Sequence, residues 1–400
     1  MTNSGMSEGA AAVVGGGIGG LAAAAGLVRI GWRVTVLERA PALRELGAGM
    51  SLMTNAQRCL DELGVGAEVR RRSATMRPGG EGLRTAMGWR LMKPASEAFV
   101  RSRRLSSIVL SRRELLRVLE RALPPGRLRI GAEVTGVDES GQLTYRSGGA
   151  MKTITADLVV AADGLNSTVR KILQPEAPAP VYSGHSVWRG ITEHPVPKSD
   201  PGGNTWGRGL EFGRMPLADG RVYWYAVANL RPGLRHLDEW QEVRRRFGRW
   251  HRPIPQLIAA TAPETVLRHD VYEMATPLPS FVSGRVVLLG DAAHAMTSDL
   301  GQGACQAIED AVVLCGALAT EPGVPAALRR YDEERGPRTQ VITEASRRMG
   351  EVKLVERRLA VIRRNVRMRL SSPRQGELAL ARIGDWRPPA LGQDKGGAVA

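Results

Sequence analysis

The stretch AAVVGGGIGGLAAAAGLV, residues 11–28, decides the fold class of this chain. An apolar run comes first, a glycine-rich turn follows, and residues 21–30 are rich in Ala and Leu, which favours a helix. A second apolar run, residues 34–37, ends at Glu38. Strand, turn, helix and strand in this order predict a βαβ unit in a parallel sheet.

Three glycines of the turn, Gly15, Gly17 and Gly20, have the spacing G-x-G-x-x-G. The first permits a tight turn, the second lets the backbone approach a pyrophosphate, and the third lets the helix pack closely on the strand. The N-terminus of the following helix favours the anion. Glu38, at the end of the next strand, can accept hydrogen bonds from ribose hydroxyls. The turn therefore predicts a dinucleotide site, and it does not by itself separate NAD from FAD.

Composition and charge exclude several classes of protein. With 400 residues, 43% hydrophobic and 24% charged, the chain is typical of a globular protein of two or three domains. The net charge is +16, but the basic residues are mostly scattered arginines without a nucleic-acid-binding signature, so we expect no nucleic-acid partner. Three cysteines are too few for a disulfide framework or a four-thiolate zinc site, and the histidines show no ligand spacing, so no metal is expected.

Segments farther along the chain extend the predicted α/β fold. Residues 156–162 and 285–289 are continuous apolar runs that predict buried strands. Residues 111–123 form an amphipathic helix that begins with a capping-box pattern, and another helix starts at about Gln302. Residues 175–279 are rich in Pro, Trp and Tyr and contain alternating runs. They predict a second, largely antiparallel sheet.

Two further motifs follow the predicted buried strands. They are Asp163-Gly164 within residues 162–170, and Gly290-Asp291 continuing to Gly301-Gln302-Gly303. The glycine turn and these two motifs follow one another in the order typical of the class A FAD-dependent monooxygenases, the para-hydroxybenzoate hydroxylase family. The chain resembles this family over roughly residues 11–340. The resemblance implies that NADPH or NADH reduces FAD and that dioxygen then supplies one oxygen atom, through a flavin hydroperoxide, to an aromatic or heteroaromatic small molecule.

The resemblance also implies which residues contact FAD. The glycine turn would hold the pyrophosphate, Glu38 the adenosine ribose, and Asp291 the ribityl chain. A helix start at about Gln302 would present N–H groups to the anionic pyrimidine end of reduced flavin. The expected cofactor-binding residues are Gly15, Gly17, Ile18, Gly20, Glu38, Arg39, Arg44, Arg112, Val134, Asp163, Asp291, Leu300, Gly301 and Gly303.

Asp299 and Tyr223 are the candidate catalytic residues. Asp299 stands where many relatives carry Asn, and a carboxylate there can orient or deprotonate substrate or hold a water. A plain helix cap is the alternative role for Asp299. Tyr223 lies in an alternating run whose aromatic side chains can line a pocket. Some relatives that act on purines use a strand arginine near the position of Glu211. The acidic residue at this position argues against a purine as the substrate.

We therefore expect an α/β fold with a Rossmann-like FAD-binding domain, an inserted mixed or antiparallel β-sheet substrate domain and a C-terminal helix. The expected boundaries are 10–75, 100–180 and 282–345 for the FAD-binding domain, 76–99 and 181–281 for the substrate domain, and 346–400 for the C-terminal helix and tail. We expect the last thirty residues to be loose. The uncharged stretch after Gly9 lacks the basic start of a signal peptide, so we expect a cytoplasmic location without a membrane partner. We expect a monomer or a homodimer.

Alternative functions remain open at this point. The same fold serves epoxidases or Baeyer–Villiger oxygenases of natural-product intermediates, and reductases. A halogenase is disfavoured because the motif W-x-W-x-I-P is absent from the sequence. An NAD-dependent dehydrogenase leaves the two later motifs unexplained. A charge-driven binder of nucleic acid or membrane would bind more weakly as salt rises.

Overall fold

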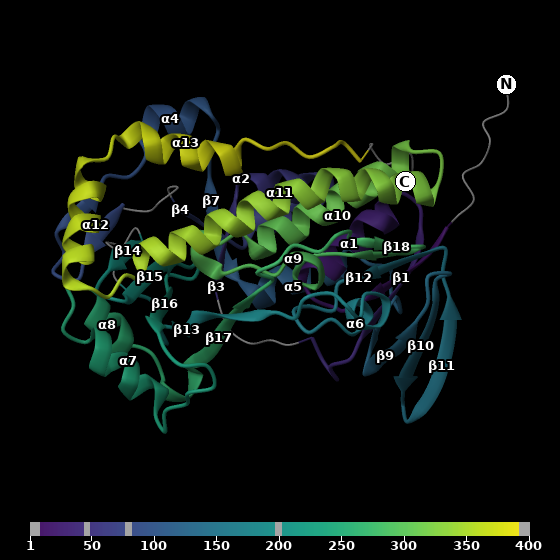
Figure 1. Cartoon of the computed structure of the whole chain (residues 1–400), viewed down its shortest axis with the longest axis horizontal. Coiled ribbons are helices and arrows are strands. Elements are labelled where there is room, and N and C mark those ends of the chain that lie inside the picture. The colour runs from purple at the N-terminus through teal and green to yellow at the C-terminus, as the bar shows by residue number, and fades with distance from the viewer. Residues whose placement is uncertain (1–8, 44–48, 77–81, 197–201, 392–400) are drawn as a thin grey trace.

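The structure is a computed structural model of the whole chain and describes residues 9–43, 49–76, 82–196 and 202–391. Arg44, one of the expected cofactor-binding residues, lies outside the described residues. The described residues form two large sheets and two small ones, with long helices packed along one side (Figure 1).

The predicted βαβ unit forms the centre of a six-stranded sheet. β1 (Ala10–Val14) pairs in parallel with β2 (Arg33–Glu38) and with β12 (Leu158–Ala161). α1 (Ile18–Arg29) connects the first two strands and begins before the predicted start, with Gly17 as its N-cap. The sheet order is β18-β19-β12-β1-β2-β8. Its edge strands are β18 (Val282–Ser283) and β8 (Leu128–Ile130), and β19 (Val286–Leu288) lies between β18 and β12.

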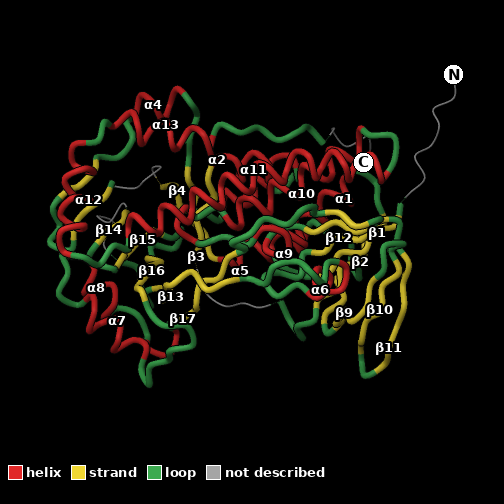
Figure 2. Tube along the Cα trace, viewed as in Figure 1, coloured by secondary structure: helices red, strands yellow, loops and turns green. Residues whose placement is uncertain are grey.

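Helices cover this sheet and form the main core with it. α10 (Gly303–Thr320) packs against α1 on one side and against α11 (Val324–Lys353) on the other. Figure 2 shows these helices running along the same side of the sheet. Among the described residues, α10 alone has the length and apolar composition of a membrane span, and most of it is buried inside the protein. α5 (Arg112–Arg121) also packs against α1, and the hydroxyl of Ser111 accepts the predicted capping hydrogen bond at 3.2 Å.

The Trp- and Tyr-rich region forms a seven-stranded sheet of mostly antiparallel strands, as predicted. Its order is β17-β13-β16-β15-β14-β5-β6. The strands are β5 (Leu83–Thr85), β6 (Arg90–Met92), β13 (Val181–Ile191), β14 (Gly203–Trp206), β15 (Leu210–Pro216), β16 (Val222–Asn229) and β17 (Leu267–Glu273). α7 (Glu239–Phe247) and α8 (Ile254–Ala259) contribute to an aromatic core around Trp188, Phe212 and Trp224. β5 and β6 lie in the segment that we expected to join this sheet.

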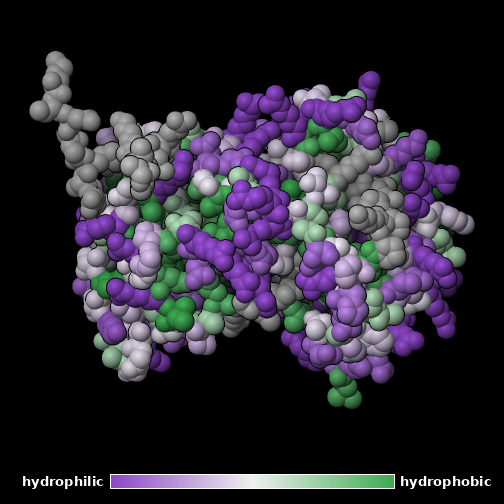
Figure 3. All heavy atoms as spheres, turned by 180° about the vertical axis from the view of Figure 1, so that it is seen from behind, coloured by the Kyte–Doolittle hydropathy of each residue, from purple (hydrophilic) through white to green (hydrophobic). Residues whose placement is uncertain are grey.

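Two three-stranded sheets complete the fold. One contains β3 (Gly49–Met53), β7 (Ser107–Ser111) and β4 (Ala74–Met76), and the other contains β9 (Ala132–Val137), β10 (Gln142–Ser147) and β11 (Ala150–Thr155). The remaining elements are α2 (Thr54–Glu62), α3 (Gly66–Arg71), α4 (Glu97–Ser102), α6 (Thr168–Leu173), α9 (Asp291–His294), η1 (Pro263–Thr265) and η2 (Ser298–Leu300). On the face drawn in Figure 3, hydrophilic side chains spread over the surface between small apolar groups.

The C-terminal part differs from the prediction. The helical pattern breaks after Lys353 into α12 (Arg358–Leu370) and α13 (Pro373–Gly384), so the expectation of a loose tail is wrong for residues 373–384. Tertiary contacts order α13. Its Glu377 carboxylate accepts hydrogen bonds from the backbone N and the hydroxyl of Ser96, and Asp385, just beyond it, pairs with Arg103 at 2.5 Å.

Candidate active site

Two adjoining cavities lie where the motifs converge. The larger cavity has a volume of about 770 Å³ and is lined by strands of the seven-stranded sheet, by the β3-β7-β4 sheet and by the loops that follow β1, β12 and β19 of the six-stranded sheet. The smaller one, of about 220 Å³, lies beside the glycine turn and the end of β2. The two cavities share Gly17, Arg112, Ala162 and Gly164, so they form one connected site.

The glycine turn is tightly packed on one side and open on the other. Gly15 has a φ of +105°, and a Cβ there would lie 2.4 Å from the carbonyl oxygen of Ala162. A Cβ on Gly20 would lie 2.0 Å from the carbonyl oxygen of Gly15, so α1 approaches the turn as closely as glycine allows. At Gly17 a Cβ would meet no atom of the described residues within 4 Å, since this glycine faces the cavities. The turn therefore fits the pyrophosphate of a dinucleotide.

Glu38 is held beside this turn. Its Oε2 accepts a hydrogen bond from Gly16 N at 2.6 Å, and its Oε1 accepts one from Ala40 N at 2.8 Å. Arg39 and Val134 line the smaller cavity together with Glu38. The structure thus brings three of the expected cofactor-binding residues together at the smaller cavity.

Charged residues line the site between its two ends. Arg112 borders both cavities, and burial lowers the pKa of its guanidinium while Asp291 opposes that shift. Asp163 accepts hydrogen bonds from Thr168 N at 2.7 Å and Val169 N at 3.2 Å through Oδ2. Its Oδ1 is buried and has no hydrogen-bond partner among the described residues. This oxygen is an acceptor for a hydroxyl or N–H group of a ligand.

The turn before α10 has the predicted form. Gln302 is the N-cap of α10, and Gly301 before it is in the left-handed region. Leu300, Gly301 and Gly303 line the larger cavity. The free N–H groups and the positive end of the helix dipole lie at this wall, and they favour an electron-rich or anionic group there.

A buried ion-pair network supports the neighbouring turn at Gly290. The Asp310 carboxylate accepts a hydrogen bond from Gly290 N at 2.9 Å, and its oxygens lie 2.6 Å from His294 Nε2 and 2.6 Å from Arg335 Nε. Burial alone would raise the pKa of Asp310, but His294 and Arg335 outweigh it and lower the pKa to about 2. His294 therefore has a structural role, since it holds the carboxylate that supports this turn. Arg335 was not predicted, because nothing in its own neighbourhood marks it.

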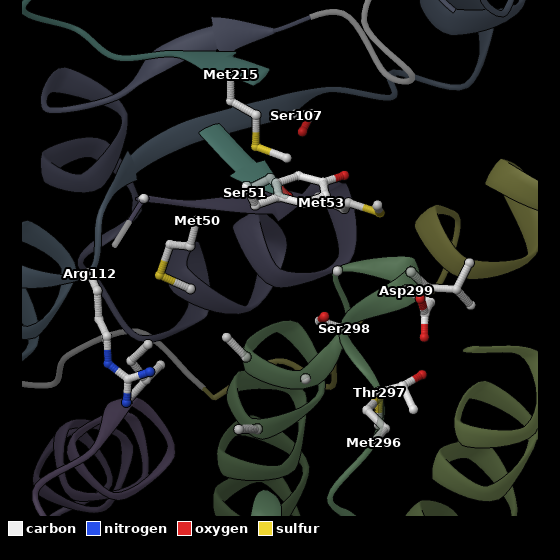
Figure 4. A pocket seen from close by; sticks show the side chains of 18 of the residues that line it. Met50, Ser51, Met53, Ser107, Arg112, Met215, Met296, Thr297, Ser298 and Asp299 are labelled. Carbon is white, nitrogen blue, oxygen red and sulfur yellow. The ribbon is translucent and has the colours of Figure 1, made fainter. Parts of the chain in front are cut away.

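A second buried cluster lies behind Asp299, at the other end of the larger cavity. In Figure 4, Asp299 and Arg112 lie on opposite sides of the view, with Met50 and Ser298 between them. Asp299 Oδ1 is 2.7 Å from Lys353 Nζ, and Lys353 also contacts Glu211. Gln302 caps α10, so the alternative role of Asp299 as the cap of that helix is wrong. Lys353 was not predicted, because in the sequence it is one more basic residue in an arginine-rich segment.

Tyr223 lines the larger cavity, and so does Tyr225, which lies two residues farther along β16. Burial raises the pKa of the Tyr223 phenol, and Arg189 opposes that shift. Trp188 and Trp206, from the same Trp- and Tyr-rich region, pack in cores outside the cavity. Of the predicted site residues that the structure describes, Gly20 alone does not line a cavity, since it packs α1 against the turn.

Comparisons with known proteins agree with this geometry. A family model described as an FAD binding domain matches residues 8–346. The chain is 37% identical over 369 residues to aurachin C monooxygenase/isomerase of Stigmatella aurantiaca, covering 90% of this chain and 94% of that protein. It is 34% identical over 355 residues to 3-amino-4-hydroxybenzoate 2-monooxygenase of Streptomyces cremeus, covering 85% of this chain and 86% of that protein.

Among solved structures, Klebsiella pneumoniae HpxO complexed with FAD and uric acid superposes with a TM-score of 0.85 at 26% identity, over 96% of this chain and 98% of that chain. These matches confirm the predicted fold class and the resemblance that the three motifs indicated. The chain belongs to the FAD binding domain family, as a relative of the FAD-dependent aromatic hydroxylases and monooxygenases.

Proposed function

We propose that this chain is an FAD-dependent monooxygenase that uses NADPH or NADH and dioxygen to insert one oxygen atom into an aromatic or heteroaromatic small molecule. One observation carries the proposal. A single connected site has a dinucleotide-binding turn and a helix N-terminus on one side, and a cavity with Asp299 and Tyr223 on the other. Such a site holds a flavin and an organic substrate next to each other.

The chain's own residues bind and orient the cofactor in this proposal. The glycine turn and the N-terminus of α1 hold the pyrophosphate. Glu38 would hold the ribose, and Arg39 and Val134 line the smaller cavity that would take this end of the cofactor. The unpaired Oδ1 of Asp163 accepts a hydrogen bond from the cofactor, and Asp291 binds the ribityl chain. FAD, when bound, supplies the redox chemistry that activates dioxygen.

At the substrate end, the cavity wall combines flexible apolar side chains with a few polar groups. Five methionines line the larger cavity: Met50, Met53, Met76, Met215 and Met296. Their flexible apolar side chains adapt to the shape of an organic ligand. Asp299, whose side chain is 1% exposed in the structure, would have to turn toward the cavity to accept a hydrogen bond or a proton from the substrate, and the Tyr223 phenol would orient the substrate. The N–H groups at the start of α10 would stabilise negative charge on a cofactor bound against this wall.

The finer features remain predictions. They comprise the choice between NADPH and NADH, a monomer or homodimer, a cytoplasmic location, the absence of nucleic-acid and membrane partners, and the domain boundaries given above. Epoxidation, Baeyer–Villiger oxygenation and reduction are alternative reactions, and no observation in the cavity favours them over hydroxylation.

Turnover under ¹⁸O₂ tests the proposed function. Purified protein would be incubated with NADPH or NADH and a panel of aromatic and heteroaromatic compounds. We expect one ¹⁸O atom in the product and about one reduced nicotinamide consumed for each product formed. A product without label, or turnover that does not need dioxygen, would contradict the proposal.

A further inference from the structure

The exposed face of α12 points to a binding surface outside the active site. We propose that this helix docks the protein onto an anionic lipid bilayer, with apolar side chains in the membrane interface and arginines at the lipid phosphates. The inference goes beyond the proposed reaction, because it concerns what the protein binds to and not what it converts. Figure 1 shows α12 at the end of the molecule that is remote from β9, β10 and β11.

The exposed side of α12 carries an apolar stripe. Its large apolar residues follow one another at intervals of three or four, so they lie on one face of the helix. They are Leu359, Ile362, Val366 and Leu370, which are 82%, 58%, 51% and 79% exposed. Single exposed apolar residues are ordinary, but a stripe along a whole helix is typical of a surface that contacts another body.

The packing of α12 fixes which face is exposed. Arg364, on the opposite side, is 7% exposed and donates hydrogen bonds to the carbonyl oxygens of Lys353 at 2.6 Å and Gly207 at 3.1 Å. Its guanidinium lies 5.5 Å from the centre of the Trp206 ring. Met368, on the same side, packs against the apolar cluster that contains Trp206. The helix therefore cannot turn its apolar stripe toward the protein without breaking these contacts.

Positive charge that the protein does not neutralise flanks the stripe. Residues 357–370 contain no acidic residue, and their exposed arginines are Arg357, Arg358, Arg363, Arg367 and Arg369. The side chains of these arginines form no hydrogen bond or ion pair with the described residues. A helix with an apolar face bordered by arginines is typical of helices that lie in the plane of a membrane surface. Anionic lipids supply the complementary charge.

The hairpin next to α12 adds exposed apolar side chains. Its second strand, β6, packs against α12. The turn between β5 and β6 carries Met87 and Trp89, which are 72% and 70% exposed. Tryptophan is enriched at the boundary between lipid and water, because its ring is apolar and its N–H group is polar. An exposed tryptophan near the stripe therefore fits a membrane surface.

Other occupants of this face fit less well. Two copies of the chain that met through α12 would bring the same arginines together, and like charges oppose such a contact. Nucleic acid would pair with the arginines but would leave the apolar stripe in water. A bilayer with anionic lipid matches both parts of the face, since its phosphates attract the arginines and its interface takes up the apolar side chains.

A helix that lies on a membrane differs from one that crosses it. α12 has 13 residues, whereas a span needs about 20. The expectation of no membrane partner rested on the missing basic start of a signal peptide, and a helix on the membrane surface needs neither a signal peptide nor a span. Binding to lipid vesicles decides between that expectation and the proposal for α12.

The proposed docking face adjoins an element of the larger cavity. α13 follows α12 directly along the chain, and its residues Leu380 and Gly384 line that cavity. Docking through α12 would therefore anchor the helix next to one wall of the proposed substrate cavity.

Binding of the FAD-loaded protein to lipid vesicles tests the proposal. The vesicles contain phosphatidylcholine alone, or phosphatidylcholine with about one third of the anionic lipid phosphatidylglycerol. We expect the anionic vesicles to bind at least about tenfold more tightly than the neutral ones, and this binding should weaken as salt rises. Flotation of the vesicles with bound protein gives the dissociation constants.

Paired variants separate the apolar stripe from other exposed apolar residues. Ile362→Ser combined with Val366→Ser should weaken binding to anionic vesicles by about tenfold or more, since both side chains lose their burial in the interface. The matched control combines Val341→Ser on α11 with Met151→Ser on β11, where the side chains are 66% and 56% exposed. The control should bind within about threefold of the wild type.

A second pair of variants separates the arginines of α12 from the general positive charge. Arg363→Gln with Arg367→Gln should weaken binding by about tenfold or more. The control, Arg121→Gln with Arg329→Gln, removes two exposed arginines from α5 and α11. Both pairs leave the same net charge, so unequal losses report where on the protein the charge acts. The control should lose less than about threefold.

A fluorescent label locates the contact. The native cysteines Cys59, Cys305 and Cys315 are buried, so a thiol added at the surface can be labelled selectively. An environment-sensitive dye on Leu359→Cys should shift its emission to shorter wavelength when anionic vesicles are added. The same dye on Val341→Cys should not shift, because α11 would face away from the lipid at that position.

Three results would overturn the proposal: equal binding to neutral and anionic vesicles, equal losses in the α12 pairs and their controls, or an unshifted dye on Leu359→Cys. A homodimer that Ile362→Ser with Val366→Ser dissociates would also overturn it and would assign the face to a second copy of the chain. None of the substituted residues lines a cavity, so FAD content should be unchanged in every variant. Failure of the docking proposal would therefore leave the proposed function intact.

Discussion

Replacing Arg335 with methionine tests how the ion-pair network holds the Gly290 turn. Arg335 is 1% exposed, and its guanidinium lies 2.6 Å from Asp310 and 2.8 Å from Glu309. Methionine fills similar space without charge, so the two buried carboxylates would lose their shared cation. Asp310 is the residue that accepts the hydrogen bond from Gly290 N. The variant should therefore weaken both the fold and the cofactor site.

The expected loss follows from burial and from the remaining partners. Breaking a buried ion pair by removing one partner costs about 3–5 kcal/mol. In the variant, Arg338 still contacts Glu309 at 2.6 Å and His294 still contacts Asp310. We therefore expect the free energy of unfolding to fall by about 3 kcal/mol, the lower end of this range. Burial raises the pKa of Asp310, but His294 and then Arg335 outweigh it and lower the pKa to about 2, so Arg335 is one of two cations that keep this carboxylate charged. Because that pKa is depressed, the stabilisation is full above about pH 4 and is lost as pH falls through 2.

Urea unfolding at pH 7 measures this loss. Arg330→Met is the control, because Arg330 lies on the same helix and pairs with Glu334 at the surface, with 37% of its side chain exposed. The free energy of unfolding of the control should fall by less than about 1 kcal/mol. The Arg335→Met protein should also retain less FAD after purification. Equal unfolding free energies for the two variants, or a loss below about 1 kcal/mol for Arg335→Met, would refute the account of the network.

Three further predictions concern the cofactor and substrate ends. Gly17→Leu should give protein with little FAD, because the side chain would extend into the open space before the turn, and a full flavin spectrum would count against the pyrophosphate site. Arg112→Met should weaken FAD binding by about tenfold or more, the scale of a lost hydrogen bond to a charged group; an unchanged dissociation constant would remove Arg112 from the site. Asp299→Ala should keep FAD but uncouple the reaction, so that reduced nicotinamide is consumed with release of hydrogen peroxide instead of product. Fully coupled turnover would reject an essential role for Asp299.

The cofactor side of the site follows from local sequence. Gly15 and Gly20 lie where another part of the backbone comes too close for a side chain. The G-x-G-x-x-G spacing indicates this requirement in the sequence. Ser111 and Gln302 mark helix starts through local capping and turn chemistry. These signals depend on neighbours within a few residues, so one sequence is enough to recognise them.

The residues behind the cavity follow from tertiary structure. Lys353 meets Glu211 and Asp299, and each of the three comes from a different element. Arg335 meets Glu309 and Asp310 on a neighbouring helix. In the sequence these two cations are indistinguishable from the many surface arginines. The same reason explains the missed α13, whose order depends on contacts with a distant part of the chain, at Ser96 and Arg103.

The central claim is that the connected site holds FAD and that a reduced nicotinamide cofactor reduces it. The most direct test is the visible spectrum of the purified protein, followed without oxygen while NADPH or NADH is added. The account predicts the absorption bands of oxidised flavin, bleaching on addition of at least one of the two cofactors, and return of the bands when air is admitted. A protein that stays colourless after incubation with FAD would contradict it.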